Sequence, residues 1–317
     1  MGQEIRKGLT RAETVIKQLE ELGWAYEFRQ GGDARITELI CIPDVSKKFL
    51  ECFPEVLIMD CTYKTNRYKL PLLDIVGQTN TNSTFYAGFG LLAAEDEVHH
   101  SRAIRSMRTL LGEKLAEKIK VVVSDREKAL INALEIALPG ASNIICIWHA
   151  NKAVLGWLKR NLPAAEEEKM ALWNALANLK DVEEFNAREE LPDLGLGDID
   201  FANYLQSTWL IYKKKLVAAW VDQKEHFGHR ASSRAEGAHS RVKKNLGTST
   251  GDLTKLVDVW VNLVEETRSE YVTEAARQAL QVYFQLGRDV LFSNVVRKIT
   301  PYALKKVSNH ELRIATY

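Results

Sequence analysis

Val56-Leu57-Ile58-Met59-Asp60 is a run of four apolar residues that ends in a carboxylate. Short apolar runs bounded by polar residues are typical of buried strands. Two more such runs follow at residues 72–79 and 84–92, and the segments that link the three runs are polar and rich in turn-forming residues. Links of this kind favour antiparallel pairing of neighbours. This part of the chain therefore predicts three consecutive antiparallel strands.

Beyond these strands the apolar pattern alternates between strand and helix. It predicts strands over 119–124 and 142–146, and helices over 98–111, 127–138 and 149–162. The resulting order, β-β-β-α-β-α-β-α, resembles the ribonuclease-H-like arrangement, in which a mixed sheet is covered by helices and strand-end carboxylates converge at one edge. We predict an α/β protein with a ribonuclease-H-like mixed sheet and flanking helices, an all-helical insertion before the last catalytic helix, and a helical C-terminal tail.

The same patterns divide the chain into five regions. Residues 1–53 form an N-terminal helix and hairpin, 54–162 the first part of the core, 163–228 an all-helical insertion, 229–250 a core helix that carries Glu236, and 251–317 a helical C-terminal region.

Bulk composition excludes several classes of protein. Of the 317 residues, 46% are hydrophobic and 27% charged, which suits a globular protein with a substantial core. No apolar run approaches the roughly 20 residues of a membrane span. The four cysteines form no Cys-x-x-Cys pair, which fits a reducing compartment. The net charge of +1 identifies no partner, but residues 209–246 carry nine Lys or Arg against three Asp or Glu.

Two aspartates stand where buried strands end. Asp60 follows the first run, and Asp125 follows Val121-Val122-Val123-Ser124. Each has an ordinary explanation, Asp60 as a cap on a turn and Asp125 as a helix N-cap. Their shared position on neighbouring strands favours a metal site instead, since two-metal catalysis needs carboxylates that bridge a pair of ions. Mg²⁺ is the natural ion for such a site, with Mn²⁺ as its substitute.

Glu236 lies among small residues, and spacing alone cannot place it beside Asp125. Its ordinary explanation is a surface glutamate on a helix. Basic residues surround it, and we predict that these contact DNA phosphates: Arg234, Arg241, Lys243 and Lys244. A solvated basic helix face is the alternative.

Cys146 and His149 form a Cys-x-x-His pair after the last predicted strand. Such a pair is half of a zinc site, and His226 with His229 would supply the other half. The alternative is an accessory role, with Cys146 buried and His149 placing a phosphate or a water near the carboxylates. Glu236 and His239 also share one helix face, a spacing that is usually incidental.

Four motifs occur together in order: residues 60–68 (DCTYKTNRY), 124–127 (SDRE), 146–149 (CIWH) and 233–240 (SRAEGAHS). In this order they resemble the transposase domain of Mutator-like elements (MULEs), a family related to the far-red-impaired proteins of plants. The resemblance covers residues 50–245, and residues 299–304 (ITPYAL) look similar to the region that follows in such proteins.

The resemblance implies a DDE triad of Asp60, Asp125 and Glu236 that binds Mg²⁺ or Mn²⁺, with Cys146 and His149 as the family's Cys-x-x-His element. It implies a nuclear enzyme that cleaves transposon ends and joins them to target DNA, working as a homo-oligomer on DNA. Full-length relatives also carry zinc-binding modules whose cysteine spacings this sequence lacks. A domesticated, non-catalytic DNA-binding or transcription-regulating protein is therefore the alternative, and a ribonuclease-H-like nuclease acting on another nucleic acid is a third.

Overall fold

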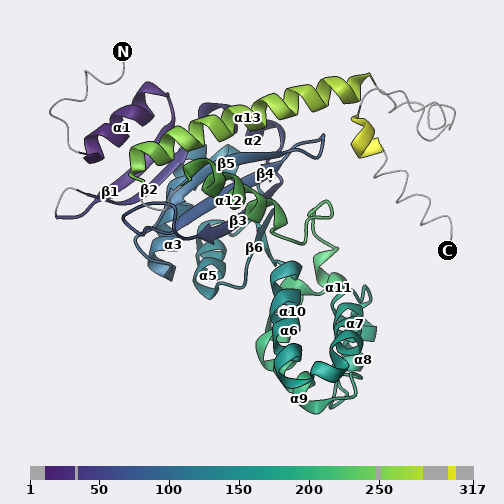
Figure 1. Ribbon diagram of the computed structural model, residues 1–317. Coiled ribbons are helices and arrows are strands. Elements are labelled where there is room, and N and C mark those ends of the chain that lie inside the picture. The colour runs from purple at the N-terminus through teal and green to yellow at the C-terminus, as the bar shows by residue number, and fades with distance from the viewer. Residues whose placement is uncertain (1–10, 33–34, 248–250, 281–298, 305–317) are drawn as a thin grey trace.

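The computed structural model describes residues 11–32, 35–247, 251–280 and 299–304. A seven-stranded sheet in the order β1-β2-β5-β4-β3-β6-β7 forms its centre (Figure 1). The strands are β1 (Ala25–Gln30), β2 (Ile36–Ile42), β3 (Val56–Thr62), β4 (Leu72–Gln78), β5 (Thr84–Leu91), β6 (Val121–Ser124) and β7 (Ser142–Ile145). The predicted mixed α/β class is confirmed.

Strand direction changes at β3. From β1 to β3 every neighbouring pair is antiparallel, whereas β3–β6 and β6–β7 are parallel. The sequence predicted the β1–β2 hairpin but not that it would extend the sheet. It does so because β2 pairs with the free edge of β5.

Helices cover both faces of the sheet. The chain forms α1 (Arg11–Glu21), α2 (Asp44–Cys52), α3 (Glu97–Leu111), α4 (Glu113–Ala116), α5 (Lys128–Ala137), α6 (Ile147–Asn161), α7 (Glu166–Ala177), α8 (Val182–Glu189), α9 (Ile199–Thr208), α10 (Lys213–Leu216), α11 (Ala218–Val221), α12 (Ser233–Leu246) and α13 (Leu253–Ala279). No helix in these described segments combines the length and apolar character of a membrane span.

Side chains of a strand alternate between the two faces, and β3 shows which helices each face meets. Val56 and Ile58 belong to the apolar cluster that includes α1, α12 and α13. Leu57 and Met59 belong to the cluster that includes α2, α3 and α5. Asp60 is two residues after Ile58 on the same strand, so its side chain projects from the same face, the one covered by α12 and α13.

Trp260 of α13 fixes that long helix on the sheet. Its side chain is fully buried, and its ring stacks on Phe89 of β5 with 4.6 Å between centroids. Helix α13 in turn packs against α12. Helix α12 also packs directly on β3 and β4, so α13 supports it from the side, within the same layer on this face of the sheet.

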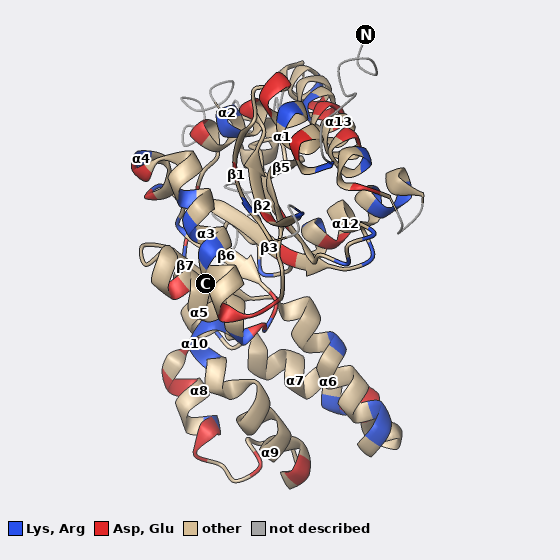
Figure 2. Cartoon of the chain, turned by 90° about the vertical axis from the view of Figure 1, so that its left-hand side faces the viewer, with Lys and Arg blue, Asp and Glu red and all other residues tan. Residues whose placement is uncertain are grey.

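Helices α6–α11 extend from the β6–β7 side of the sheet and have an apolar cluster largely their own (Figure 1). Trp173, Phe185 and Phe201 are fully buried in it. Figure 2 shows acidic residues on α8 and α9, whose N-caps are Asp181 and Asp198. Acidic residues near a helix N-terminus stabilise it, which accounts for part of the acidic charge of residues 166–200.

Part of the predicted helical C-terminal region, residues 281–298 and 305–317, falls outside the described residues. The division into five regions stays a prediction.

Candidate metal centre

The two aspartates lie at the same end of neighbouring strands. Parallel strands β3 and β6 pair Ile58 with Val123, and Asp60 and Asp125 each come two residues later. Asp60 is 7% exposed. Asp125 Oδ1 accepts a hydrogen bond from the Glu127 amide at 3.1 Å, so its side chain stabilises the turn between β6 and α5. The N-cap of α5 is Glu127 rather than Asp125.

Glu236 reaches this strand end from α12. The helix is anchored to β5 by two contacts: Arg234 donates to Thr84 Oγ1 at 2.7 Å, and the Tyr86 hydroxyl donates to the Ala238 carbonyl oxygen at 3.3 Å. Glu236 comes from the first turn of the helix. Glu236 follows Asp125 by 111 residues in the sequence. The packing of α12 brings it back to the strand end, which the sequence spacing could not predict.

Asp60, His149 and Glu236 each offer one ligand atom, and these atoms lie within 4.8 Å of one another. Asp125 is not in this group, although its charge acts on Asp60. The structure thus brings together two of the three predicted carboxylates and the predicted accessory histidine.

Both ring nitrogens of His149 contact polar side chains. Its Nδ1 lies 3.3 Å from Ser232 Oγ, and its Nε2 lies 3.3 Å from Glu236 Oε1. Cys146 precedes α6 and is buried, and its sulfur accepts hydrogen bonds from the Ser232 amide at 3.0 Å and hydroxyl at 3.2 Å. A histidine with one nitrogen fixed and the other turned toward carboxylates has the usual orientation of a metal ligand.

The group fits a divalent cation. Within the described part of the chain, Glu236 Oε1 is buried, and although His149 Nε2 lies 3.3 Å away, no hydrogen bond of good geometry satisfies this oxygen. Carboxylate oxygens with one imidazole suit Mn²⁺ or Zn²⁺ as well as Mg²⁺. Asp60, His149 and Glu236 would hold such an ion.

Burial and mutual repulsion set the proton affinities here. Burial, and then the charge of Asp125, raises the pKa of Asp60 to about 7. Burial also raises the pKa of Asp125. The hydrogen bond with Cys146 raises the pKa of His149 against the opposing effect of burial. Burial would raise the pKa of Cys146, but hydrogen bonds from His149 and Ser232 outweigh it and lower this pKa. The cluster is thus a site where an added cation would relieve repulsion between carboxylates.

Divalent-metal binding is expected to weaken as the pH falls from about 8 to about 6, because only ionised Asp60 is a ligand and its pKa is about 7. Metal-free protein should show the opposite trend in stability. The folded state raises this pKa from 3.8, so it binds the proton more tightly than the unfolded chain and gains stability as the pH falls through 7 toward 4. Calorimetric titration with Mn²⁺ and thermal unfolding, each at several pH values, measure both trends. Equal Mn²⁺ affinity across this range would contradict the expectation, and Asp60→Asn is the control that should show a smaller stability trend, because the raised pKa of Asp125 still contributes.

The predicted DNA-contacting residues divide into two pairs. Arg234 is held by the β4–β5 turn through Asn82 and Thr84, and Arg241 forms ion pairs with Glu266 and Glu270 of α13. Lys243 and Lys244 are exposed. The arginines therefore contribute to docking α12, whereas the lysines face solvent.

The four-ligand zinc arrangement is not formed. Among the described residues, the group around Asp60 is the one cluster of three or more metal-ligating side chains, and it contains neither Cys146 nor His226. His226 Nε2 instead lies 3.3 Å from Asp222 Oδ1.

Two site neighbours, Asp74 and His239, went unrecognised as functional in the sequence. Asp74 is the cross-strand partner of Asp60 and is fully buried. His239 lies between the two carboxylates, 3.6 Å from Asp60 Oδ2 and 3.3 Å from Asp74 Oδ2. The available signal was an aspartate inside the otherwise apolar run Leu72–Val76.

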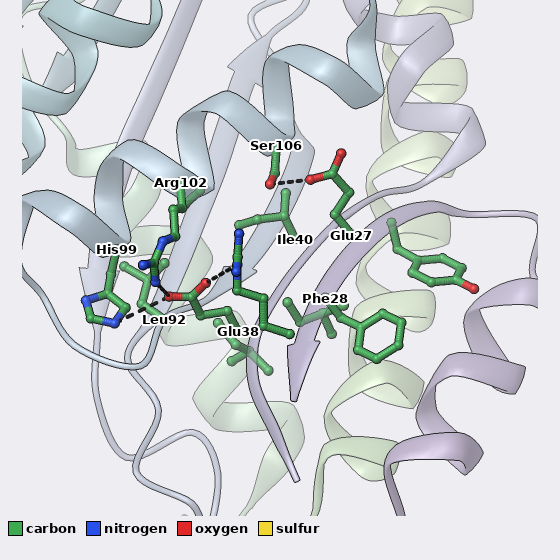
Figure 3. Close-up of a pocket in the computed structure, with 13 residues that line it drawn as sticks. Glu27, Phe28, Glu38, Ile40, Leu92, His99, Arg102 and Ser106 are labelled. Atoms are coloured by element: carbon green, nitrogen blue, oxygen red, sulfur yellow. Dashed lines mark hydrogen bonds and ion pairs between the residues drawn. The ribbon is translucent and has the colours of Figure 1, made fainter. Parts of the chain in front are cut away.

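A cavity of about 450 Å³ lies apart from this centre, between β1, β2 and α3 (Figure 3). Glu38 in its wall contacts three basic side chains, Arg29, His99 and Arg102, at 3.3, 3.4 and 3.1 Å. Its carboxylate is therefore already neutralised. Around Asp60, by contrast, the neighbouring basic groups are histidines, and burial and the charges of the nearby carboxylates raise the pKa of Asp60.

Known proteins match this chain across the strand-end site. A family model described as MULE transposase domain matches residues 56–153, which include Asp60, Asp125 and His149. Protein FAR1-RELATED SEQUENCE 4 of Arabidopsis thaliana is 30% identical over 110 residues, covering 35% of this chain and 14% of the relative. Protein FAR1-RELATED SEQUENCE 11 of the same plant is 20% identical over 298 residues, covering 92% of this chain and 42% of the relative.

A fungal protein also matches over most of the chain. The PKS-NRPS hybrid synthetase cheA of Chaetomium globosum is 20% identical over 308 residues, which make up 86% of this chain but 6% of the synthetase. The chain thus spans less than half the length of each of these relatives. The matches agree with the four sequence motifs, and the chain is related to the MULE transposases and the FAR1 family.

Proposed function

We propose that this chain is the catalytic core of a DNA transposase that cleaves DNA and transfers strands in a metal-dependent reaction. The observation that carries the proposal is the convergence of Asp60, His149 and Glu236 from β3, α6 and α12. Residues 56–153 match the MULE transposase domain, which supports DNA as the substrate.

The strand order supports a ribonuclease-H-like core. Strands β5-β4-β3-β6-β7 place three antiparallel strands beside two parallel ones. Strands β6 and β7 run parallel to β3 and end on the same side of the sheet. Asp60 and Asp125 lie at this side. The β1–β2 hairpin and α6–α11 are then additions to that core.

Each site residue has a distinct role in the proposed reaction. A bound divalent ion supplies charge stabilisation and activation of the attacking oxygen. Asp60, Glu236 and His149 would hold the ion, and Asp125, whose charge acts on Asp60, lies at the end of the neighbouring strand. Ser232 and Cys146 orient His149, and Lys243 and Lys244 offer exposed charge to DNA phosphates. We further propose a nuclear location and assembly as a homo-oligomer on DNA.

A cleavage assay tests the proposal. End-labelled duplexes of the DNA that flanks the protein's own gene, with any inverted repeats it contains, are incubated with Mg²⁺ or Mn²⁺, and nicked products are resolved on denaturing gels. Wild-type protein should cleave with metal and stop with a chelator. Glu236→Gln should lose cleavage by about 10²-fold or more, since a removed ligand forfeits several kcal/mol of charge stabilisation. Glu183→Gln on exposed α8 is the matched control and should cleave like wild type.

The outcomes separate the candidate functions. Metal-dependent cleavage that Glu236→Gln abolishes supports the transposase. Binding to the same DNA without cleavage by wild-type protein would refute catalysis and favour a domesticated DNA-binding regulator. Cleavage of RNA or of unrelated structured DNA in preference to the repeats would favour a general nuclease.

A further inference from the structure

Asp74 is a fully buried carboxylic acid in the middle of the sheet. It lies on β4, directly opposite Asp60 in the antiparallel register, so both side chains project from the same face. Within the described residues, neither oxygen of Asp74 has a hydrogen-bond partner of good geometry. Burying such a group costs free energy that an apolar residue would not cost. Packing alone therefore gives no reason for an aspartate here.

His239 connects this acid to the metal centre. Its Nε2 lies 3.3 Å from Asp74 Oδ2 and also 3.3 Å from the Asp60 carbonyl oxygen. Its Nδ1 lies 3.6 Å from Asp60 Oδ2. The ring is thus placed between two acidic side chains and contacts Asp60 through both backbone and side chain. Like Asp74, the His239 side chain is buried, so water does not replace these contacts.

His239 also affects the position of Glu236, because both residues belong to α12. His239 follows Glu236 by three residues on α12, and residues at this spacing share a helix face. Where His239 is seated on β3 and β4, the position of Glu236 over the strand end is also set. The contact therefore links β4, β3 and α12 at the point where two proposed ligands meet.

We propose that Asp74 and His239 are positioning residues, which hold the Asp60 carboxylate and the first turn of α12 in the geometry that binds the metal. This inference rests on the proposed function, because it assigns a partner to a ligand of that site. Polar side chains that contact metal ligands orient them, and the loss of such partners typically costs about 10–100-fold in metal affinity. Two other roles are distinguishable by experiment: Asp74 as a metal ligand itself, and Asp74 as a purely structural residue.

The test compares Asp74→Asn, which keeps the size and a polar end that can contact His239, with Asp74→Val, which removes the polar group and suits a buried strand. Mn²⁺ affinity is measured by calorimetry and electron paramagnetic resonance, and thermal unfolding is measured on metal-free protein. Asp74→Val should bind Mn²⁺ about 10–100-fold more weakly while its metal-free form unfolds at a higher temperature than wild type. Asp74→Asn should stay within about threefold of wild type, well inside that range.

A double variant tests whether the two residues act in series. His239→Phe should weaken Mn²⁺ binding about as much as Asp74→Val, and the double variant should add little to either change, because both break one connection. Additive losses would overturn the link through His239. Exposed Asp44→Asn on α2 is the control for loss of an acidic residue remote from the site.

Three results would overturn the inference. If Asp74→Val binds Mn²⁺ like wild type but unfolds at a lower temperature, Asp74 is structural. If Asp74→Asn loses as much affinity as Asp60→Asn, Asp74 is a ligand. If wild-type protein binds no Mn²⁺, the proposed metal centre itself fails and the inference falls with it; wild-type binding that Asp60→Asn abolishes and Asp74→Val leaves intact refutes the inference alone.

Discussion

Asp60→Asn is expected to abolish divalent-metal binding and to lower the rate of DNA cleavage by about 10³-fold or more, the largest loss of any single substitution at the site. The reason is its central position. Asp60 lies within 4.8 Å of the His149 and Glu236 ligand atoms, and its charge also interacts with that of Asp125. An amide keeps the size of the side chain but provides a single weak oxygen ligand without charge.

The variant should nevertheless fold. Burial and the Asp125 charge disfavour ionised Asp60, so a neutral amide relieves repulsion, and metal-free Asp60→Asn should be at least as stable as wild type at about pH 8. Mn²⁺ titration, cleavage kinetics and thermal unfolding give the three readouts. Exposed Asp44→Asn is the control. Cleavage by Asp60→Asn at more than about a tenth of the wild-type rate would remove this residue from the catalytic site.

Trp260→Ala is expected to cost about 3–5 kcal/mol of unfolding free energy, the range for truncation of a large buried aromatic side chain. Trp260 is fully buried and stacks on Phe89 of the sheet. Its removal opens a cavity between α13 and β5, so the lateral support that α13 gives to α12 is weakened. Urea unfolding followed by circular dichroism measures the loss.

Trp148→Ala provides the comparison, because Trp148 is 38% exposed and stands on α6 outside the sheet core. Its substitution should change the unfolding free energy by less than about 1 kcal/mol. A loss below about 1 kcal/mol for Trp260→Ala as well would show that α13 does not depend on this contact.

The sequence predicted local elements better than long-range neighbours. The strands that carry Asp60 and precede Asp125 were visible because β-branched and aliphatic residues occur in short runs with polar ends. That the β1–β2 hairpin joins β5 was not visible, because pairing between distant strands depends on free edges that only the assembled sheet presents. Glu236 was assigned to the site from the family motifs alone. Its position depends on how α12 packs, which the sequence pattern does not reveal.

The role of Asp74 was missed for a different reason. Its run was recognised as a strand, but the strand's register against β3 decides whether residue 74 faces residue 60 or the opposite helix layer. A shift of one residue would reverse the face. The contributions of Arg234 and Arg241 were likewise hidden, because whether a basic side chain meets solvent or a neighbouring carboxylate is decided by tertiary contacts.

The two ends of the segment formed by α6–α11 lie against each other. The Ile147 amide donates to the Arg230 carbonyl oxygen at 2.8 Å, and Cys146 Sγ accepts from Ser232. The segment therefore leaves and re-enters the core through one narrow neck, and His149 and Glu236 stand on either side of that neck. Changes in length or surface charge in the body of this segment are therefore expected to leave the distance between those two residues unaltered. The segment is attached to the core at the point where the proposed metal ligands are held.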